Sequence, residues 1–303
     1  MIAAFYLAAN FIGGIPLIIG MLVHSASDPQ ALSRLAANPS NLGLAGLNQN
    51  LMLFLMLFPF IVGLVTFALL IKPLHGRTFR QTITGAPRFR WNRFFASSLV
   101  WVVLSVLYFV VYRAVEPSNF RLNNTSTSLI WLAVISVVFI PFQALLEEVL
   151  FRGYLMQSFT VLSVRYKLAA PAFLAAIITS VLFGVMHSWN PEIKEYGFFT
   201  MIPQYILFGL IFAITTICDD GIEIAAGAHA ANNVFLSIFI TNSSSTLQTP
   251  AMFEQVNIKP WTEFTALVIV SVLFLIILGR IFRFQKYKAL FGNYDQAHNV
   301  PGM

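Results

Sequence analysis

The sequence predicts an all-α integral membrane protein, a polytopic bundle of about eight transmembrane helices that forms one domain over residues 1–303. Hydrophobic residues make up 58% of the chain, charged residues make up 10%, and the mean hydropathy is +0.77. A water-soluble domain carries about 25% charged residues. The apolar residues are also gathered into long runs, and most basic residues lie between these runs.

The apolar runs give the expected helices. A bilayer core about 30 Å thick requires about 20 apolar residues in each crossing helix. Eight runs approach this length. They cover Ile2–Val23, Asn50–Ile71, Phe94–Tyr112, a run from Ser128 into the stretch around Glu147, Ala169–His187, Phe198–Cys218, Ile222–Ile240 and Phe264–Phe282. The polar segment Thr241–Pro260 is expected to be an irregular loop.

The lysines and arginines predict the orientation. Thirteen of the 18 lie in residues 72–93, 152–167 and 280–288, which share one side of the membrane if both termini are cytoplasmic. Because cytoplasmic loops carry an excess of lysine and arginine, we expect cytoplasmic N- and C-termini. The basic segment Lys72–Arg93 is expected to lie on an anionic leaflet, with substrate steering as the alternative.

Three ionisable residues interrupt the fourth apolar run: Glu147, Glu148 and Arg152. Each such residue costs about 2.5–3.5 kcal/mol at the centre of a membrane helix, so these residues must be paired, hydrated or functional. Glu148 and Arg152 are four residues apart and share a helix face, which predicts an ion pair. Glu147 is turned about 100° away, so this pair leaves it free for chemistry.

Further polar residues lie in later runs. His187 ends the fifth run, and His229 and Asn233 lie four apart in the seventh. Singly, a buried histidine or asparagine is more often an interhelical hydrogen-bonding group than a catalyst. With the two glutamates, these residues would supply a base, an orienting group and donors for developing negative charge, which together can hydrolyse an amide with an activated water.

Acidic residues also flank the start of the seventh run. Glu223, Asp219 and Asp220 are expected to complement the positive N-terminal end of that helix.

These groups would lie at different depths in a simple up-and-down bundle. For them to meet, we expect Pro141 to break the fourth helix, so that a helix over about 142–161 holds the glutamates deeper. We also expect the fifth helix to continue past His187 towards Trp189–Pro191.

The polar residues carry three motifs that resemble those of the CPBP family of intramembrane proteases: EExxxR, FxxxH and HxxxN. Here they extend from Glu147 to Arg152, from Phe183 to His187 and from His229 to Asn233, in the family's order, and Gly153 fits the family's usual EExxxRG. The family contains the type II CAAX prenyl endopeptidases and the bacterial Abi proteins linked to bacteriocin immunity. The matching positions, residues 141–235, lie within an expected catalytic core of about residues 128–240.

The resemblance implies an endopeptidase, often labelled a metalloprotease, that hydrolyses a peptide bond in a membrane-associated or lipid-modified, CAAX-type protein. It implies that Glu147 activates the attacking water with help from His187, and that His229 and Asn233 form an oxyanion hole beside the supporting ion pair of Glu148 and Arg152. The implied partners are a membrane-embedded or lipidated peptide or protein and membrane lipids, with no nucleic acid. The implied location is the prokaryotic cytoplasmic membrane.

Several alternatives stay open. No cofactor is favoured, but Glu147, His187 and His229 could bind zinc with one position free for water. The HExxH pattern of zinc proteases is absent, and a water activated by glutamate needs no ion. A non-catalytic immunity or scaffold protein is a second possible function, and a proton-coupled transporter is a third. The complete motifs argue against the scaffold, and the lack of an inverted repeat argues against the transporter. The natural substrate, the cleavage site and the oligomeric state stay open.

Overall fold

The computed structural model describes residues 1–31, 33–34, 46–284 and 287–291. Its first half contains α1 (Ile2–Leu7), η1 (Ala8–Ile12), α2 (Ile15–Ser27), α4 (Gln49–His75), α5 (Phe79–Ile83), α6 (Trp91–Val115), η3 (Pro117–Asn119), β1 (Phe120–Leu122) and α7 (Ser128–Glu148). Its second half contains η4 (Val149–Leu155), α8 (Met156–Arg165), α9 (Pro171–Met186), η5 (His187–Trp189), α10 (Pro191–Tyr196), α11 (Phe198–Asp219), α12 (Glu223–Phe239), β2 (Ile240–Thr241), β3 (Phe253–Gln255), α13 (Pro260–Phe282) and η6 (Tyr287–Leu290).

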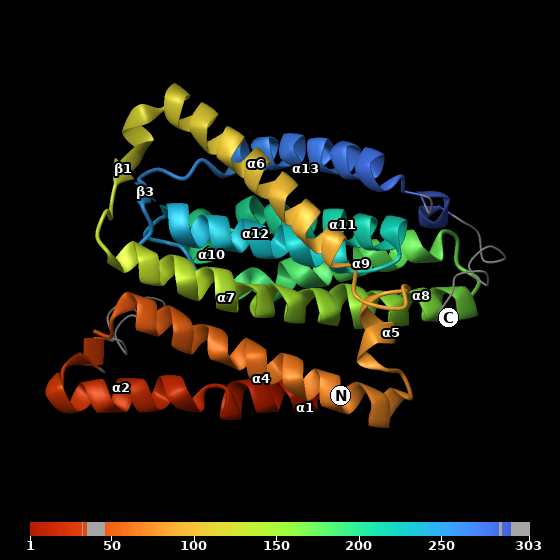
Figure 1. Ribbon diagram of the computed structural model, residues 1–303, viewed down its shortest axis with the longest axis horizontal. Coiled ribbons are helices and arrows are strands. Elements are labelled where there is room, and N and C mark those ends of the chain that lie inside the picture. Colours follow the sequence, from red (N-terminus) through yellow and green to blue (C-terminus); the bar gives the residue numbers. More distant parts are fainter. Residues whose placement is uncertain (32, 35–45, 285–286, 292–303) are drawn as a thin grey trace.

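The expected all-α polytopic bundle is confirmed. Among the described residues, seven helices are long and apolar enough to cross a membrane: Ala4–Ser27, Gln49–His75, Trp91–Val115, Ser128–Arg165, Pro171–Trp189, Phe198–Asp219 and Pro260–Phe282. The chain is therefore an integral multi-pass membrane protein. In Figure 1, α1 lies towards the same end of the bundle as the last turn of α13. Which side of the membrane this end faces stays a prediction. Lys286, one of the basic residues on which that prediction rests, lies outside the described residues.

The eighth expected helix differs from the others. Helix α12 has 17 residues, which is shorter than the about 20 that a membrane crossing requires. It lies inside the bundle against α6, α7 and α11 (Figure 1), and the whole segment from Glu223 to Ala231 is buried. Its sequence explains this position, since a run of alanines and one glycine lets neighbouring backbones approach closely. The interior of the bundle therefore contains a helix that carries the ionisable residues Glu223 and His229.

A small sheet closes the end of the bundle at which α7 begins (Figure 1). Strand β3 pairs antiparallel with β1, with Arg121 opposite Glu254, and parallel with β2, with Ile240 opposite Phe253. The expectation that Thr241–Pro260 is irregular is therefore wrong at β2 and β3. The strands form because the loops between α6 and α7 and between α12 and α13 meet at this end, a pairing that neither loop encodes alone.

At the opposite end, hydrogen bonds and ion pairs connect the turn between α11 and α12 to the residue before α6 and to the first turn of α6. Arg90 donates two hydrogen bonds from its guanidinium to Glu223, at 2.7 and 3.0 Å, and Arg93 Nε donates to Asp219 Oδ2 at 2.9 Å. Burial lowers the pKa of Arg90, but its hydrogen bonds to Glu223 and the negative charge of that group outweigh the effect and raise the pKa. Glu223 does lie in the first turn of α12, as expected.

Two expectations about charged residues need correction at this end of the bundle. Arg90 and Arg93 were expected to face an anionic leaflet, and they bind carboxylates of the protein. Asp219 was expected only to complement the charge of a helix end, but it forms an ion pair with Arg93. These contacts could not be predicted because they join residues more than 120 positions apart.

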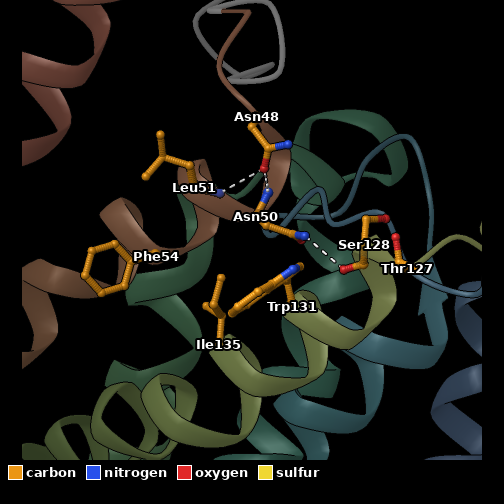
Figure 2. Close-up of a pocket in the computed structure, with 8 residues that line it drawn as sticks. All are labelled: Asn48, Asn50, Leu51, Phe54, Thr127, Ser128, Trp131 and Ile135. Atoms are coloured by element: carbon orange, nitrogen blue, oxygen red, sulfur yellow. Dashed lines mark hydrogen bonds between the residues drawn. The ribbon is translucent and has the colours of Figure 1, made fainter.

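A pocket of about 440 Å³ lies between the first turns of α4 and α7 (Figure 2). Figure 2 shows Asn50 reaching from α4 to α7, where its side-chain amide donates to the carbonyl oxygen of Ser128 at 2.9 Å. Asn48 caps α4 by accepting hydrogen bonds from the amides of residues 50 and 51. The eight residues that line the pocket all fall within positions 48–54 and 127–135, so it does not include the glutamate pair.

Gly227 is expected to be essential for the packing of α12 on α6. A Cβ atom at this position would overlap the carbonyl oxygen of Phe94 and the hydroxyl of Ser97. We expect Gly227→Ala to lower the free energy of unfolding by about 1–3 kcal/mol, the usual cost of overpacking. Thermal unfolding in detergent measures this, with Gly279→Ala as the control, because a Cβ there would make only ordinary contact, at 3.5 Å, with Phe284. Equal stability of the two variants would contradict this packing.

Candidate functional site

One long helix presents the two glutamates. Helix α7 continues through the π-helical turn η4 into α8, so residues 128–165 form a single 38-residue span. Pro141 lies inside α7, and the expectation that it breaks the helix is wrong. Neighbouring helices and local turn adjustments allow proline within membrane helices. Because the helix extends to Arg165, Glu147 and Glu148 lie at its middle, which removes the expected mismatch in depth.

The Glu148–Arg152 ion pair is present and fully enclosed. Arg152 Nη1 lies 3.0 Å from Glu148 Oε1, and the two side chains are 1% and 0% exposed. Arg152 Nη2 donates to the carbonyl oxygen of Gly209 on α11 at 3.0 Å. The guanidinium also lies over the ring of Phe183, 4.6 Å from its centroid. This arrangement explains the phenylalanine of FxxxH, because an aromatic face stabilises a desolvated cation.

His229 lies between the two glutamates. Its Nδ1 atom is 2.7 Å from Glu148 Oε1, and its Nε2 atom is 3.7 Å from Glu147 Oε2. Its ring stacks on Phe212, with centroids 5.3 Å apart. Because Glu148 is the partner of Arg152 and acts as an acceptor, the Nδ1–H group donates to it. The Nε2 atom therefore faces Glu147, at a distance too long for a direct hydrogen bond.

Glu147 is buried but only half satisfied. The side-chain amide of Gln143, one turn earlier on α7, donates to Glu147 Oε1 at 2.9 Å. The other oxygen, Oε2, is buried and has no hydrogen-bond partner within the described parts of the chain. The residue is 7% exposed. Glu147 was expected to be free, and the structure shows that one of its oxygens is engaged by Gln143. The other oxygen stays available beside His229.

Asn233 reaches Glu147 only through another residue. Its Nδ2 atom donates to Gln143 Oε1 at 3.2 Å, and its Oδ1 atom accepts from Asn232 Nδ2 at 3.0 Å. One N–H of its amide is engaged with Gln143, and an amide nitrogen carries two. The structure therefore places Asn233 in the same polar network as Glu147, one residue removed.

His187 lies at the edge of this network. Helix α9 ends at Met186 and continues as the 3₁₀ turn η5, so the chain stays helical to Trp189, as expected. The Nδ1 atom of His187 lies 2.7 Å from the carbonyl oxygen of Phe183, which leaves Nε2 as the acceptor atom of the ring. Within the described residues His187 forms no hydrogen bond or ion pair with Glu147. The ring of Phe183 contacts both histidine rings, with centroids 4.6 Å from His187 and 6.0 Å from His229.

Two residues of the site were missed from the sequence. Gln143 links Glu147 to Asn233, and Tyr205 stacks on the ring of His187 with centroids 4.2 Å apart. The Tyr205 hydroxyl also donates to Glu192 on α10. A signal existed for Gln143, since it is a polar residue four positions before Glu147 in an apolar run. No such signal existed for Tyr205, because tyrosine is common in membrane helices.

The arrangement does not fit a zinc ion held by three protein ligands. In the described part of the chain, no group of three histidine, cysteine, aspartate or glutamate side chains is placed to hold a metal ion. Glu147 and His229 face each other, but within the described residues no hydrogen bond or ion pair joins the expected third ligand, His187, to either of them. A catalytic zinc site needs three ligands and an open position.

The fold and the site define a class: a polytopic α-helical membrane protein whose carboxylates and imidazole meet inside the bundle. Residues 126–235 match the family described as "Type II CAAX prenyl endopeptidase Rce1-like". This match confirms the resemblance based on the three motifs. The segment contains the two glutamates, Arg152, both site histidines and Asn233.

A similarity to a named protein extends beyond this segment. The chain is 32% identical over 200 residues to the "Uncharacterized protein YyaK" of Bacillus subtilis (strain 168). The aligned part covers 65% of this chain and 64% of the relative, so the chain spans just under two thirds of the length of the curated relative it matches. No solved structure matches the chain significantly.

Proposed function

We propose that this protein is an intramembrane endopeptidase that hydrolyses a peptide bond in a membrane-associated or lipid-modified protein. The observation that carries the proposal is the position of Glu147 Oε2, buried, without a hydrogen-bond partner among the described residues and 3.7 Å from His229 Nε2. Burying a carboxylate oxygen without a hydrogen-bond donor costs free energy, and ionisable groups buried in this way inside a membrane protein mark functional sites. The match to the Rce1-like family supports proteolysis as that purpose.

The proposed reaction uses one water molecule. Glu147 Oε2 accepts a proton from the water as its oxygen attacks the carbonyl carbon of the scissile peptide bond, with His187 helping to orient the water. In this step His229 carries a proton on Nε2 as well as on Nδ1, and its Nε2–H and the second N–H of Asn233 stabilise the negative charge that develops on the carbonyl oxygen. The carbon–nitrogen bond then breaks, and Glu147 returns the proton to the leaving amine. Glu148 and Arg152 hold the imidazole of His229 in place throughout.

The proposal is tested by following the fate of water. The purified protein is reconstituted in liposomes with farnesylated, geranylgeranylated and unmodified C-terminal peptides in ¹⁸O-labelled water. We expect one of the lipidated peptides to be cleaved, with one ¹⁸O atom in the new carboxyl group by mass spectrometry. If no peptide is cleaved, and alanine at both His187 and His229 leaves the phenotype of the cell unchanged, the non-catalytic scaffold is the better interpretation.

We also expect cleavage to survive metal removal. The physical reason is that Glu147 and His229 face each other without a third protein ligand in reach within the described residues. The measurement is the cleavage rate after treatment with EDTA and 1,10-phenanthroline, together with elemental analysis of the protein. Activity that is lost on chelation and restored by zinc alone would contradict the metal-free mechanism.

A further inference from the structure

Four side-chain N–H groups form a row that ends at Glu147. They belong to α6, α12 and α7, and each donates to the next residue in the same direction. The row consists of Trp101 Nε1 to Asn232 Oδ1 at 3.2 Å, Asn232 Nδ2 to Asn233 Oδ1 at 3.0 Å, Asn233 Nδ2 to Gln143 Oε1 at 3.2 Å, and Gln143 Nε2 to Glu147 Oε1 at 2.9 Å.

The two ends of the row fix its direction. An indole N–H can only donate, and an ionised carboxylate can only accept. Trp101 is 1% exposed, so it has no water to turn towards. Each of the three amides between the ends must therefore present its oxygen towards Trp101 and its nitrogen towards Glu147. Hydrogen bonds aligned in this way polarise and strengthen one another in a low-dielectric interior.

The row acts on one oxygen of Glu147. Gln143 occupies Oε1, and rotation of the carboxylate would break that hydrogen bond. The other oxygen, Oε2, is thereby kept on the side of His229, where the proposed function places the water. Gln143 itself lies on the same helix as Glu147, one turn away, so the two side chains share a helix face.

We propose that Gln143 is a positioning residue that aims Glu147 Oε2 at the reacting water, and that the row from Trp101 holds the Gln143 amide in the required orientation. This inference rests on the proposed function, because it assigns Glu147 as the base. It adds α6, through Trp101, to the parts of the chain that determine the reaction rate.

The test compares Gln143→Leu with Gln157→Leu. Both glutamines lie on the 128–165 span, but Gln157 donates to the carbonyl oxygen of Thr82, outside the row. We expect Gln143→Leu to lower kcat by about 10- to 100-fold with KM nearly unchanged, since small misplacement of a reacting group can cost about 100-fold. We expect Gln157→Leu to leave both constants unchanged.

Infrared difference spectroscopy gives a readout that does not depend on activity. The carboxylate band of Glu147, identified by its loss in Glu147→Gln, is expected to shift in Gln143→Leu and to stay in place in Gln157→Leu. An unshifted band, or equal kcat values for the two leucine variants, would overturn the inference. A shifted band in a protein that cleaves no peptide would instead overturn the proposed function.

A second variant, Trp101→Phe, tests the inference if Gln143→Leu does not fold. Trp101→Phe keeps an aromatic ring in the cluster with Phe208, Phe212 and Phe274 and removes only the first donor of the row. We expect a smaller shift of the same Glu147 band and a fall in kcat of about 2- to 5-fold, because weakening one bond of a cooperative row changes the others only in part. No shift in this variant would show that the row does not reach Glu147.

Discussion

Replacing Glu147 with glutamine is expected to lower the cleavage rate by about 10²- to 10⁴-fold, the usual contribution of a general base. Glutamine has nearly the same shape, and its carbonyl oxygen can still accept the hydrogen bond from Gln143. The variant therefore removes the proton acceptor while it keeps the polar network. The measurement is kcat for a cleaved lipidated peptide in liposomes, with the thermal unfolding temperature as a check on folding.

Glu195→Gln is the matched control for this prediction. Glu195 is an exposed glutamate on α10, so the same substitution there removes a carboxylate without entering the bundle. We expect that control to retain the rate of the unaltered protein. If Glu147→Gln cleaves as fast as the control, Glu147 is not the base and the proposed mechanism is wrong.

The helices and part of the site could be predicted because the physics involved is local. Twenty apolar residues in a row predict a membrane helix, and a spacing of four predicts that Glu148 and Arg152 meet on one face. Nothing beyond the spacing of residues on one helix is needed for either prediction. The structure places Arg152 and Glu148 together for that reason.

The rest of the site depends on contacts between distant segments. His229 meets Glu148 across 81 positions of sequence, and Asn233 meets Gln143 across 90. Hydrophobic periodicity does not encode which helices are neighbours, so it could not show that Gln143 joins Glu147 to Asn233. The same limit applies to Pro141, because whether a proline ends a membrane helix depends on the helices that surround it.

The composition of helix α12 is explained by the helices that surround it. Its alanines, its glycine and its short length weaken the membrane-span signal, although they are the features that allow it to lie among α6, α7 and α11. A weakly apolar helix within a strongly apolar chain is therefore a good place to search for a buried site. Here that helix carries His229 and Asn233.

Removing Arg152 is expected to be the most destabilising single substitution in the site. In Arg152→Met, Glu148 would stay fully buried with only His229 as a hydrogen-bond donor. Breaking one partner of a buried pair costs about 3–5 kcal/mol, because the remaining charge has neither water nor a counterion. The free energy of unfolding in detergent micelles measures this loss. Lys259→Met is the control, since its pair with Glu116 is exposed and worth about 0–1 kcal/mol.

The double variant separates the stability of the pair from its role in the reaction. Neutralising both partners, in Glu148→Gln with Arg152→Met, removes the uncompensated charge, so we expect it to recover much of the lost stability. We do not expect it to recover cleavage, because an amide at position 148 can still accept the Nδ1–H of His229 but lacks the negative charge that favours His229 as a donor to the developing oxyanion. If the double variant regained both stability and rate, the pair would serve folding alone, and the orientation of His229 would have to come from its stacking on Phe212.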